Sequence, residues 1–76
     1  MARTMFLMWY DDNPKLSVLK KIEAAIEAYT DRFAMTPNVV LVNEAEVVQH
    51  TDVAVRGATN IRRNNFWVGI EAVGAE

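Results

Sequence analysis

Two segments of this chain are apolar on both of the faces that a β-strand presents, and only one long amphipathic segment is available to cover them. The second of them, Asn38–Asn43, is a β-branched run. The first, Thr4–Tyr10, alternates Phe6, Met8 and Tyr10 with Met5, Leu7 and Trp9. Such strands are typical of sheets with both faces covered. With a helix between them, the two segments predict a right-handed crossover in which the strands run parallel.

The segment between these strands predicts a long helix from Lys15 to about Phe33. Apolar residues recur there at spacings of three and four: Leu19, Ile22, Ile26, Tyr29 and Phe33, with Leu16, Val18 and Ala25 widening the stripe. Before it, Asp11–Pro14 predicts a turn in which Asp12 or Asn13 caps the helix. Pro37 marks its end.

The second half of the chain carries weaker patterns. Glu44–Gln49 suits a short helix, Asp52–Arg56 a third strand and Phe66–Glu71 a fourth. Residues 57–65 form either a long loop or, from residue 60, a strand that pairs with the last one across a tight turn at Asn64. We therefore predict one α+β domain over residues 1–76. It has a small mixed sheet of three or four strands, one long helix on one face, and the order strand, helix, strand, short helix and β-hairpin.

Composition excludes several classes of protein. The 76 residues are 51% hydrophobic, which suits one small core, and the absence of cysteine removes disulfides, thiolate metal sites and cysteine nucleophiles. The formal net charge of −2 gives no global basic field of the kind that nucleic-acid binders use. No segment approaches the roughly 20 apolar residues of a membrane span. We expect a cytoplasmic protein with no cofactor and no membrane partner.

The predicted helices are too few to cover both faces of the sheet, and this leads to a prediction about assembly. One long and one short helix cover about one and a half faces of a four-stranded sheet, so something else must cover the rest. A second copy is the simplest candidate, with Trp9 and Trp67 at the contact. The sequence thus predicts a homodimeric interaction or regulatory module without catalytic activity. In the alternative, residues 44–51 fold across the open face and the protein is a monomer.

Acidic side chains follow both early strands. Asp11 and Asp12 come after the first strand and Glu44 after the second, where the carboxyl ends of parallel strands share an edge. Carboxylate oxygens suit Mg²⁺ or Ca²⁺, so these three residues are the candidate metal ligands. In the competing interpretation they cap helices and are otherwise solvated.

The candidate site for an anion or a nucleic acid is a basic cluster that precedes the last strand. It consists of Arg56, Arg62, Arg63 and Asn64. Guanidinium groups with amides and neighbouring aromatic rings are used for phosphate binding and base stacking. An antiparallel third strand would carry this tip about 17 Å from the acidic edge. Self-association is the expected partnership, and a metal-dependent or nucleic-acid-processing component is the alternative.

His50 is the only histidine. It could act as a general base only if a carboxylate oriented it beside a hydroxyl such as that of Thr51 or Ser17. The sequence around Ser17 lacks the glycine-flanked elbow that exposes a nucleophile. An ordinary structural histidine is the competing interpretation.

The opening strand with Asp11 and the amphipathic helix after it resembles the start of the small CRISPR-associated adaptor nucleases. The resemblance implies a dimeric ferredoxin-like domain in which Asp11 matches the aspartate that directly follows the first strand, and it belongs to the alternative function. It covers the first strand and the helix. The second long helix of such domains has no counterpart pattern here.

Overall fold

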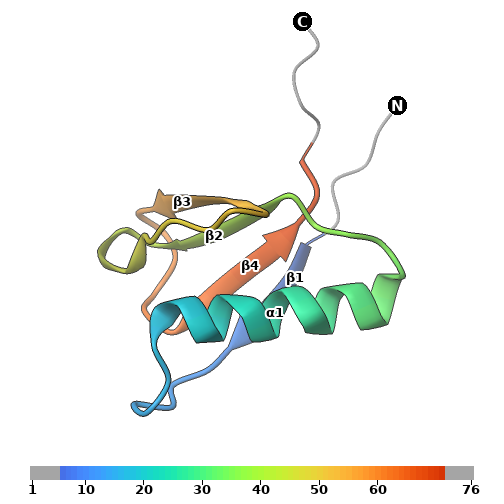
Figure 1. Cartoon of the computed structure of the whole chain (residues 1–76). Helices are drawn as coiled ribbons and strands as arrows, with labels where there is room; N and C mark the ends of the chain where they lie inside the picture. Colours follow the sequence, from blue (N-terminus) through green and yellow to red (C-terminus); the bar gives the residue numbers. More distant parts are fainter. Residues whose placement is uncertain (1–5, 72–76) are drawn as a thin grey trace, which may run out of the picture.

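The structure is a computed structural model that describes residues 6–71 (Figure 1). It confirms the predicted α+β class with a four-stranded mixed sheet and one 16-residue helix packed on it. The elements are β1 (Phe6–Tyr10), α1 (Val18–Phe33), β2 (Val39–Asn43), the short 3-10 helix η1 (Glu44–Glu46), β3 (Ala54–Ala58) and β4 (Asn65–Gly69). None of the helices in the described part is long and apolar enough to cross a membrane.

The sheet order is β1-β4-β2-β3. β4 runs antiparallel to both of its neighbours, so β1 and β2 are parallel as predicted, but β4 lies between them. β3 pairs with β2 in parallel. The ends of β1, β2 and β3 and the start of β4 therefore share one edge of the sheet, which we call the carboxyl edge.

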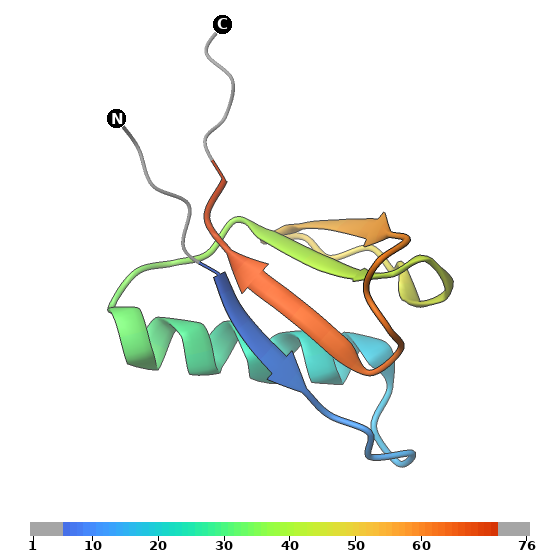
Figure 2. The same cartoon turned by 180° about the vertical axis from the view of Figure 1, so that it is seen from behind.

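The predicted β-hairpin is wrong. β3 and β4 are consecutive in sequence, yet β2 separates them in the sheet (Figure 2). Pairing β4 with both β1 and β2 buries Phe66 and Val68 completely, which an edge hairpin would not achieve. Residues 59–64 form a connection rather than a strand, with Asn64 in the left-handed conformation at φ 70°.

Helix α1 begins later than predicted. Its N-cap is Ser17, whose Oγ accepts a hydrogen bond from the Lys20 amide at 3.2 Å. Asn13 instead closes a local turn by accepting from the Lys15 amide at 2.9 Å. The helix ends at Ala34, which takes a left-handed conformation and donates its amide to the Thr30 carbonyl at 2.8 Å.

The core lies between α1 and one face of the sheet, which we call the helix face. Ile22, Ala25 and Tyr29 are fully buried against it, whereas Leu19 stays 39% exposed. The register places alternate strand residues on this face, and the core contains Trp9, Phe66, Val68, Val40, Val42 and Val55. The predicted stripe therefore faces the core at Ile22, Ala25 and Tyr29, whereas Leu19 lies at its exposed margin.

Residues 47–53, which we call the strap, connect η1 to β3 and lie on the helix face. Val48 and Val53 pack against the core. A Cβ at Gly57, which would point to the same face as Val55, would lie 3.1 Å from Val47 Cγ2. The segment that could have covered the opposite face therefore covers the helix face, beside α1 (Figure 1).

Candidate functional site

The face of the sheet turned away from α1 carries no covering helix or strand among residues 6–71 (Figure 2). Its central row, read across the four strands, is Met8, Trp67, Leu41 and Arg56. Met8 is 67% exposed and Tyr10, farther along β1, is 62% exposed. We call this surface the open face.

An ion pair crosses the open face. Arg56 on β3 binds the carboxylate of Glu71, two residues after β4. Because β2 lies between these strands, the pair spans β2, and the register places Val39 beneath it. Val39 is fully buried although it faces away from the helix. The uncovered apolar part of the open face is therefore concentrated on β1 and β4.

Tyr10 contributes a polar group to the rim of the open face. Its hydroxyl donates to Oδ2 of Asp12 at 3.1 Å. This hydrogen bond, followed by the negative charge of Asp12, raises the pKa of Tyr10. Asp12 is thereby tied to the open face rather than to the start of α1.

The two tryptophans lie on opposite faces. Trp9 packs on the helix face against the core, with its Nε1 buried and without a hydrogen-bond partner among the described residues. Trp67 lies on the open face, opposite Met8 and Leu41. Of the two predicted contact residues, Trp67 lies on the open face and Trp9 on the helix face, and both are partly buried.

At the carboxyl edge, Asn64 joins four segments of the chain. Its amide donates to Glu46 Oε1 at 2.9 Å, its carbonyl accepts from the Asp11 amide at 2.9 Å, and its Oδ1 accepts from Lys21 Nζ at 3.2 Å. Lys21 is 5% exposed and Glu46 is 6% exposed. Asn43 adds a further bond, from Nδ2 to the Ile61 carbonyl at 2.8 Å. The edge is thus a hydrogen-bonded network that anchors β1, α1, η1 and β4.

Two of the three candidate metal ligands accept hydrogen bonds from within the chain. Asp11 Oδ1 accepts from the Asn13 amide at 2.9 Å, Asp12 accepts from Tyr10, and Glu44 opens η1. Among residues 6–71 no three histidine, aspartate or glutamate side chains are grouped so that they could hold a metal ion.

Arg56 lies apart from the other candidates of the basic cluster. Arg56 is engaged on the open face, whereas Arg62 and Arg63 are exposed in the turn before β4. Because β3 is parallel to β2 and not antiparallel, this turn lies at the carboxyl edge, beside the acidic residues, and the expected separation of about 17 Å is wrong. Asn64 uses its Oδ1, amide and carbonyl within the network.

His50 does not form the arrangement of a general base. Its Nδ1 accepts the Asp52 amide at 3.0 Å, so the neutral ring carries its proton on Nε2. Ser17 is engaged as the cap of α1, 33 positions earlier in the chain. A base that must accept a proton at Nε2 is therefore not available in this conformation.

Sequence reasoning missed two buried charged side chains, Lys21 and Glu46, each of which is hydrogen-bonded to Asn64. A signal was present for the lysine, because it lies one helical turn after Val18 and one before Ala25, within the apolar stripe. A lysine at such a position indicates a buried partner. Comparison with known proteins gives no further guidance, since no family model, curated protein or solved structure matches this chain.

Proposed function

We propose that this protein is an interaction module that pairs with a second copy of itself through the open face. The observation that carries the proposal is the row of Met8, Trp67 and Leu41 on a sheet face that no described element covers. Methionine and aromatic side chains are enriched at interface cores relative to other protein surface.

The size of the domain supports this pairing. A chain of 76 residues buries only about 60% of the surface that its unfolded form exposes, so covering a further apolar face adds substantially to its stability. The strap and α1 are both used on the helix face. A second copy is a suitable occupant because two-fold symmetry brings each apolar row against an identical one.

The area of the open face gives an order-of-magnitude expectation for the dissociation constant of the proposed dimer. Four strands about 4.8 Å apart and five residues long project onto roughly 300 Å² per copy, and protruding side chains raise the accessible area to about 500 Å². A dimer would then bury about 1,000 Å² in total, at the low end of specific interfaces. We expect a dissociation constant of roughly 1–100 μM, and a monomer at nanomolar concentration.

Sedimentation equilibrium between 1 and 500 μM tests the proposal. The Met8→Lys variant should shift the monomer–dimer equilibrium at least tenfold toward monomer, because it places a charge in the apolar row that forms the contact. The matched control is Met35→Lys: Met35 is 45% exposed, lies after α1 and is not on the sheet. It should leave the equilibrium unchanged.

Two results would contradict the proposal. One is a protein that remains monomeric at 500 μM. The other is a dimer that Met8→Lys and Met35→Lys weaken equally, which would place the contact elsewhere. Circular dichroism of both variants distinguishes loss of pairing from loss of folding. A monomer whose open face binds a different protein would also refute self-pairing.

A further inference from the structure

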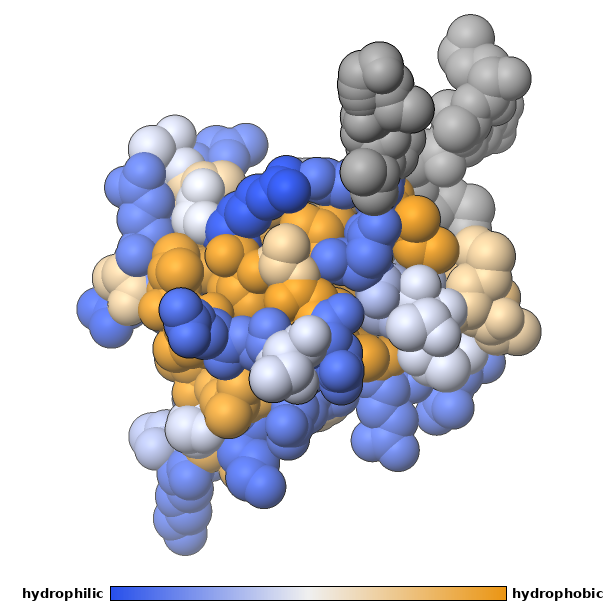
Figure 3. All heavy atoms as spheres, turned by 45° about the horizontal axis from the view of Figure 1, so that its top comes forward, coloured by the Kyte–Doolittle hydropathy of each residue, from blue (hydrophilic) through white to orange (hydrophobic). Residues whose placement is uncertain are grey.

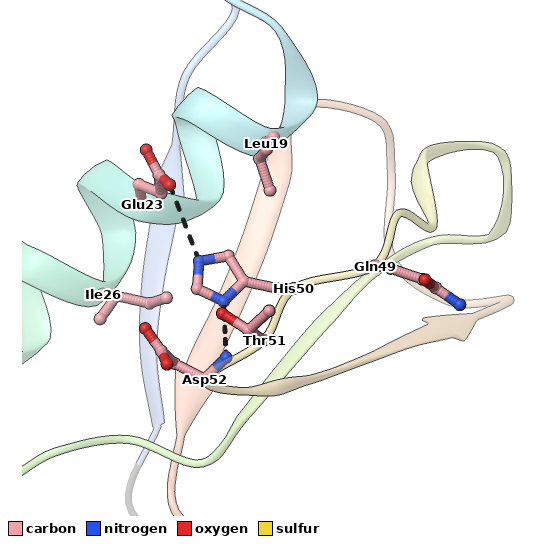
Figure 4. A pocket seen from close by; sticks show the side chains of 7 residues that line it. All are labelled: Leu19, Glu23, Ile26, Gln49, His50, Thr51 and Asp52. Carbon is pink, nitrogen blue, oxygen red and sulfur yellow. Dashed lines mark hydrogen bonds and ion pairs between the residues drawn. The ribbon is translucent and has the colours of Figure 1, made fainter.

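A pocket of about 330 Å³ lies between α1 and the strap, on the helix side of the sheet and away from the open face (Figure 4). Leu19 and Ile26 supply an apolar wall from α1, and His50 and Asp52 enter from the strap. Its volume is at the lower end of the range of small-molecule sites. Over β3 and the strap, apolar surface continues between polar side chains (Figure 3).

His50 is the inner group of this pocket. Its side chain is only 8% exposed, and its ring lies between the strap and α1 (Figure 4). The Asp52 amide holds Nδ1, so the Nε2–H points toward Glu23. The Nε2 to Oε2 distance is 3.9 Å, too long for a hydrogen bond, and no other described residue accepts this proton.

The charges around the pocket have one sign. Glu23 and Asp52 place carboxylates on either side of Ile26, and the described residues lining the pocket include neither lysine nor arginine (Figure 4). Glu23 is 51% exposed and free to move toward a ligand. One of its oxygens can accept the His50 Nε2–H while the other accepts from a bound cation.

We propose that this pocket binds an ammonium or guanidinium group carried on an aliphatic chain. The cation lies between the carboxylates of Glu23 and Asp52, and the methylene groups pack on Leu19 and Ile26. An anion would meet two carboxylates. A divalent metal ion would need a third ligand of the same kind, and the described residues hold no such group.

The test is an NMR titration of the full chain with three ligands whose aliphatic chains are of similar length: butylguanidinium, butylammonium and butyrate. A ligand of this size should bind with roughly millimolar affinity. Both cations should shift the amide signals of His50 and Asp52, and butyrate should not. Equal shifts with butyrate would overturn the proposal, because they would show that only the apolar wall contributes.

Variants identify the groups responsible. Glu23→Gln and Asp52→Asn should each weaken cation binding about fivefold, since each removes one charge-assisted contact. Glu27→Gln is the matched control, because it makes the same change one turn along α1 at an exposed position outside the pocket. If it weakens binding as much as the other two, the cation is held by the general charge of the helix and the proposal fails.

The same chemistry could come from a free amine or from a basic side chain of another protein. A blocked Gly-Arg-Gly peptide separates these sources. Binding at least as tight as that of butylguanidinium supports an arginine or lysine side chain as the ligand. Binding of the free cations with exclusion of the peptide supports a free amine. Failure of all the cations to bind overturns the site and leaves the self-pairing of the open face unaffected.

Discussion

Replacement of Asn64 tests the network of the carboxyl edge. Asn64 has φ 70°, and its Oδ1 accepts from Lys21 Nζ, whose residue is 5% exposed. Asn64→Gly keeps the backbone conformation but leaves the buried ammonium without that acceptor. The loss of a hydrogen bond to a charged group costs about 2 kcal/mol. Asn64→Ala adds about 1 kcal/mol for a left-handed backbone with a Cβ, which makes about 3 kcal/mol in total.

These costs are large for a domain of this size. At roughly 0.05–0.15 kcal/mol per residue, its free energy of unfolding is about 4–11 kcal/mol. One kcal/mol shifts the melting temperature of such a domain by about 4–8 °C. Asn64→Gly should therefore lower the melting temperature by about 10 °C and Asn64→Ala by about 18 °C. Urea denaturation followed by circular dichroism, at a concentration where sedimentation shows one species, gives the free energies directly.

The double variant Lys21→Met with Asn64→Gly isolates the contact. Removing the ammonium together with its acceptor should recover most of the loss caused by Asn64→Gly, because no buried charge is then left unpaired. Asn60→Ala is the control: Asn60 is exposed in the same connection, and the change should cost less than about 0.5 kcal/mol. Two results would contradict this argument. One is that Asn64→Gly lowers the free energy of unfolding no more than Asn60→Ala does. The other is that the losses caused by Lys21→Met and Asn64→Gly simply add in the double variant.

Three further predictions follow from single contacts. The raised pKa of Tyr10 stabilises the fold below about pH 10, the value in the unfolded chain, and the contribution is lost as the pH rises through the folded pKa. Asp12→Asn should bring this pKa back toward 10. The measurement is the absorbance at 295 nm as the pH rises, with the Tyr10→Phe variant as the reference that lacks this phenol. Trp9→Phe should change stability by less than about 1 kcal/mol, since it removes a buried donor that has no partner while keeping an aromatic ring. Gly57→Ala should cost about 1–2 kcal/mol in urea denaturation, because the new Cβ would lie 3.1 Å from the Glu44 backbone.

Local patterns were sufficient for the elements but not for their pairing. The alternation of β1 correctly separated Met8 from Trp9, and the periodicity of α1 located a helix that the structure confirms over Val18–Phe33. Both patterns are set by side-chain spacing along a few residues. The insertion of β4 between β1 and β2 depends on pairs 55–63 positions apart in sequence for β1 and 26–30 for β2, and nothing in Phe66–Val68 specifies which strand it joins.

The difference between local patterns and long-range strand pairing also explains why the candidate sites could be named from the sequence but not positioned. Every acidic and basic candidate was found by residue type, but their relative positions depended on the direction of β3. Because β3 is parallel to β2, the strap must return the chain to the end of the sheet where β2 begins. Residues 47–53 carry no helical or strand pattern that would have indicated this return. The pocket at His50 is a product of that crossing, because His50 reaches α1 only through the strap.

The parallel pairing of β3 also determines which surfaces remain free for partners. It brings the turn at Asn64 to the carboxyl edge, where Glu46, Asn43 and Asp11 all form hydrogen bonds within the chain. Polar groups that are already paired gain little from a ligand, because each new bond must replace an existing one. The hydrogen-bonded network of the carboxyl edge therefore stabilises the fold. The surfaces with unmet requirements are the open face, with its exposed Met8, and the pocket, where the described lining residues offer the carboxylates of Glu23 and Asp52 neither a lysine nor an arginine.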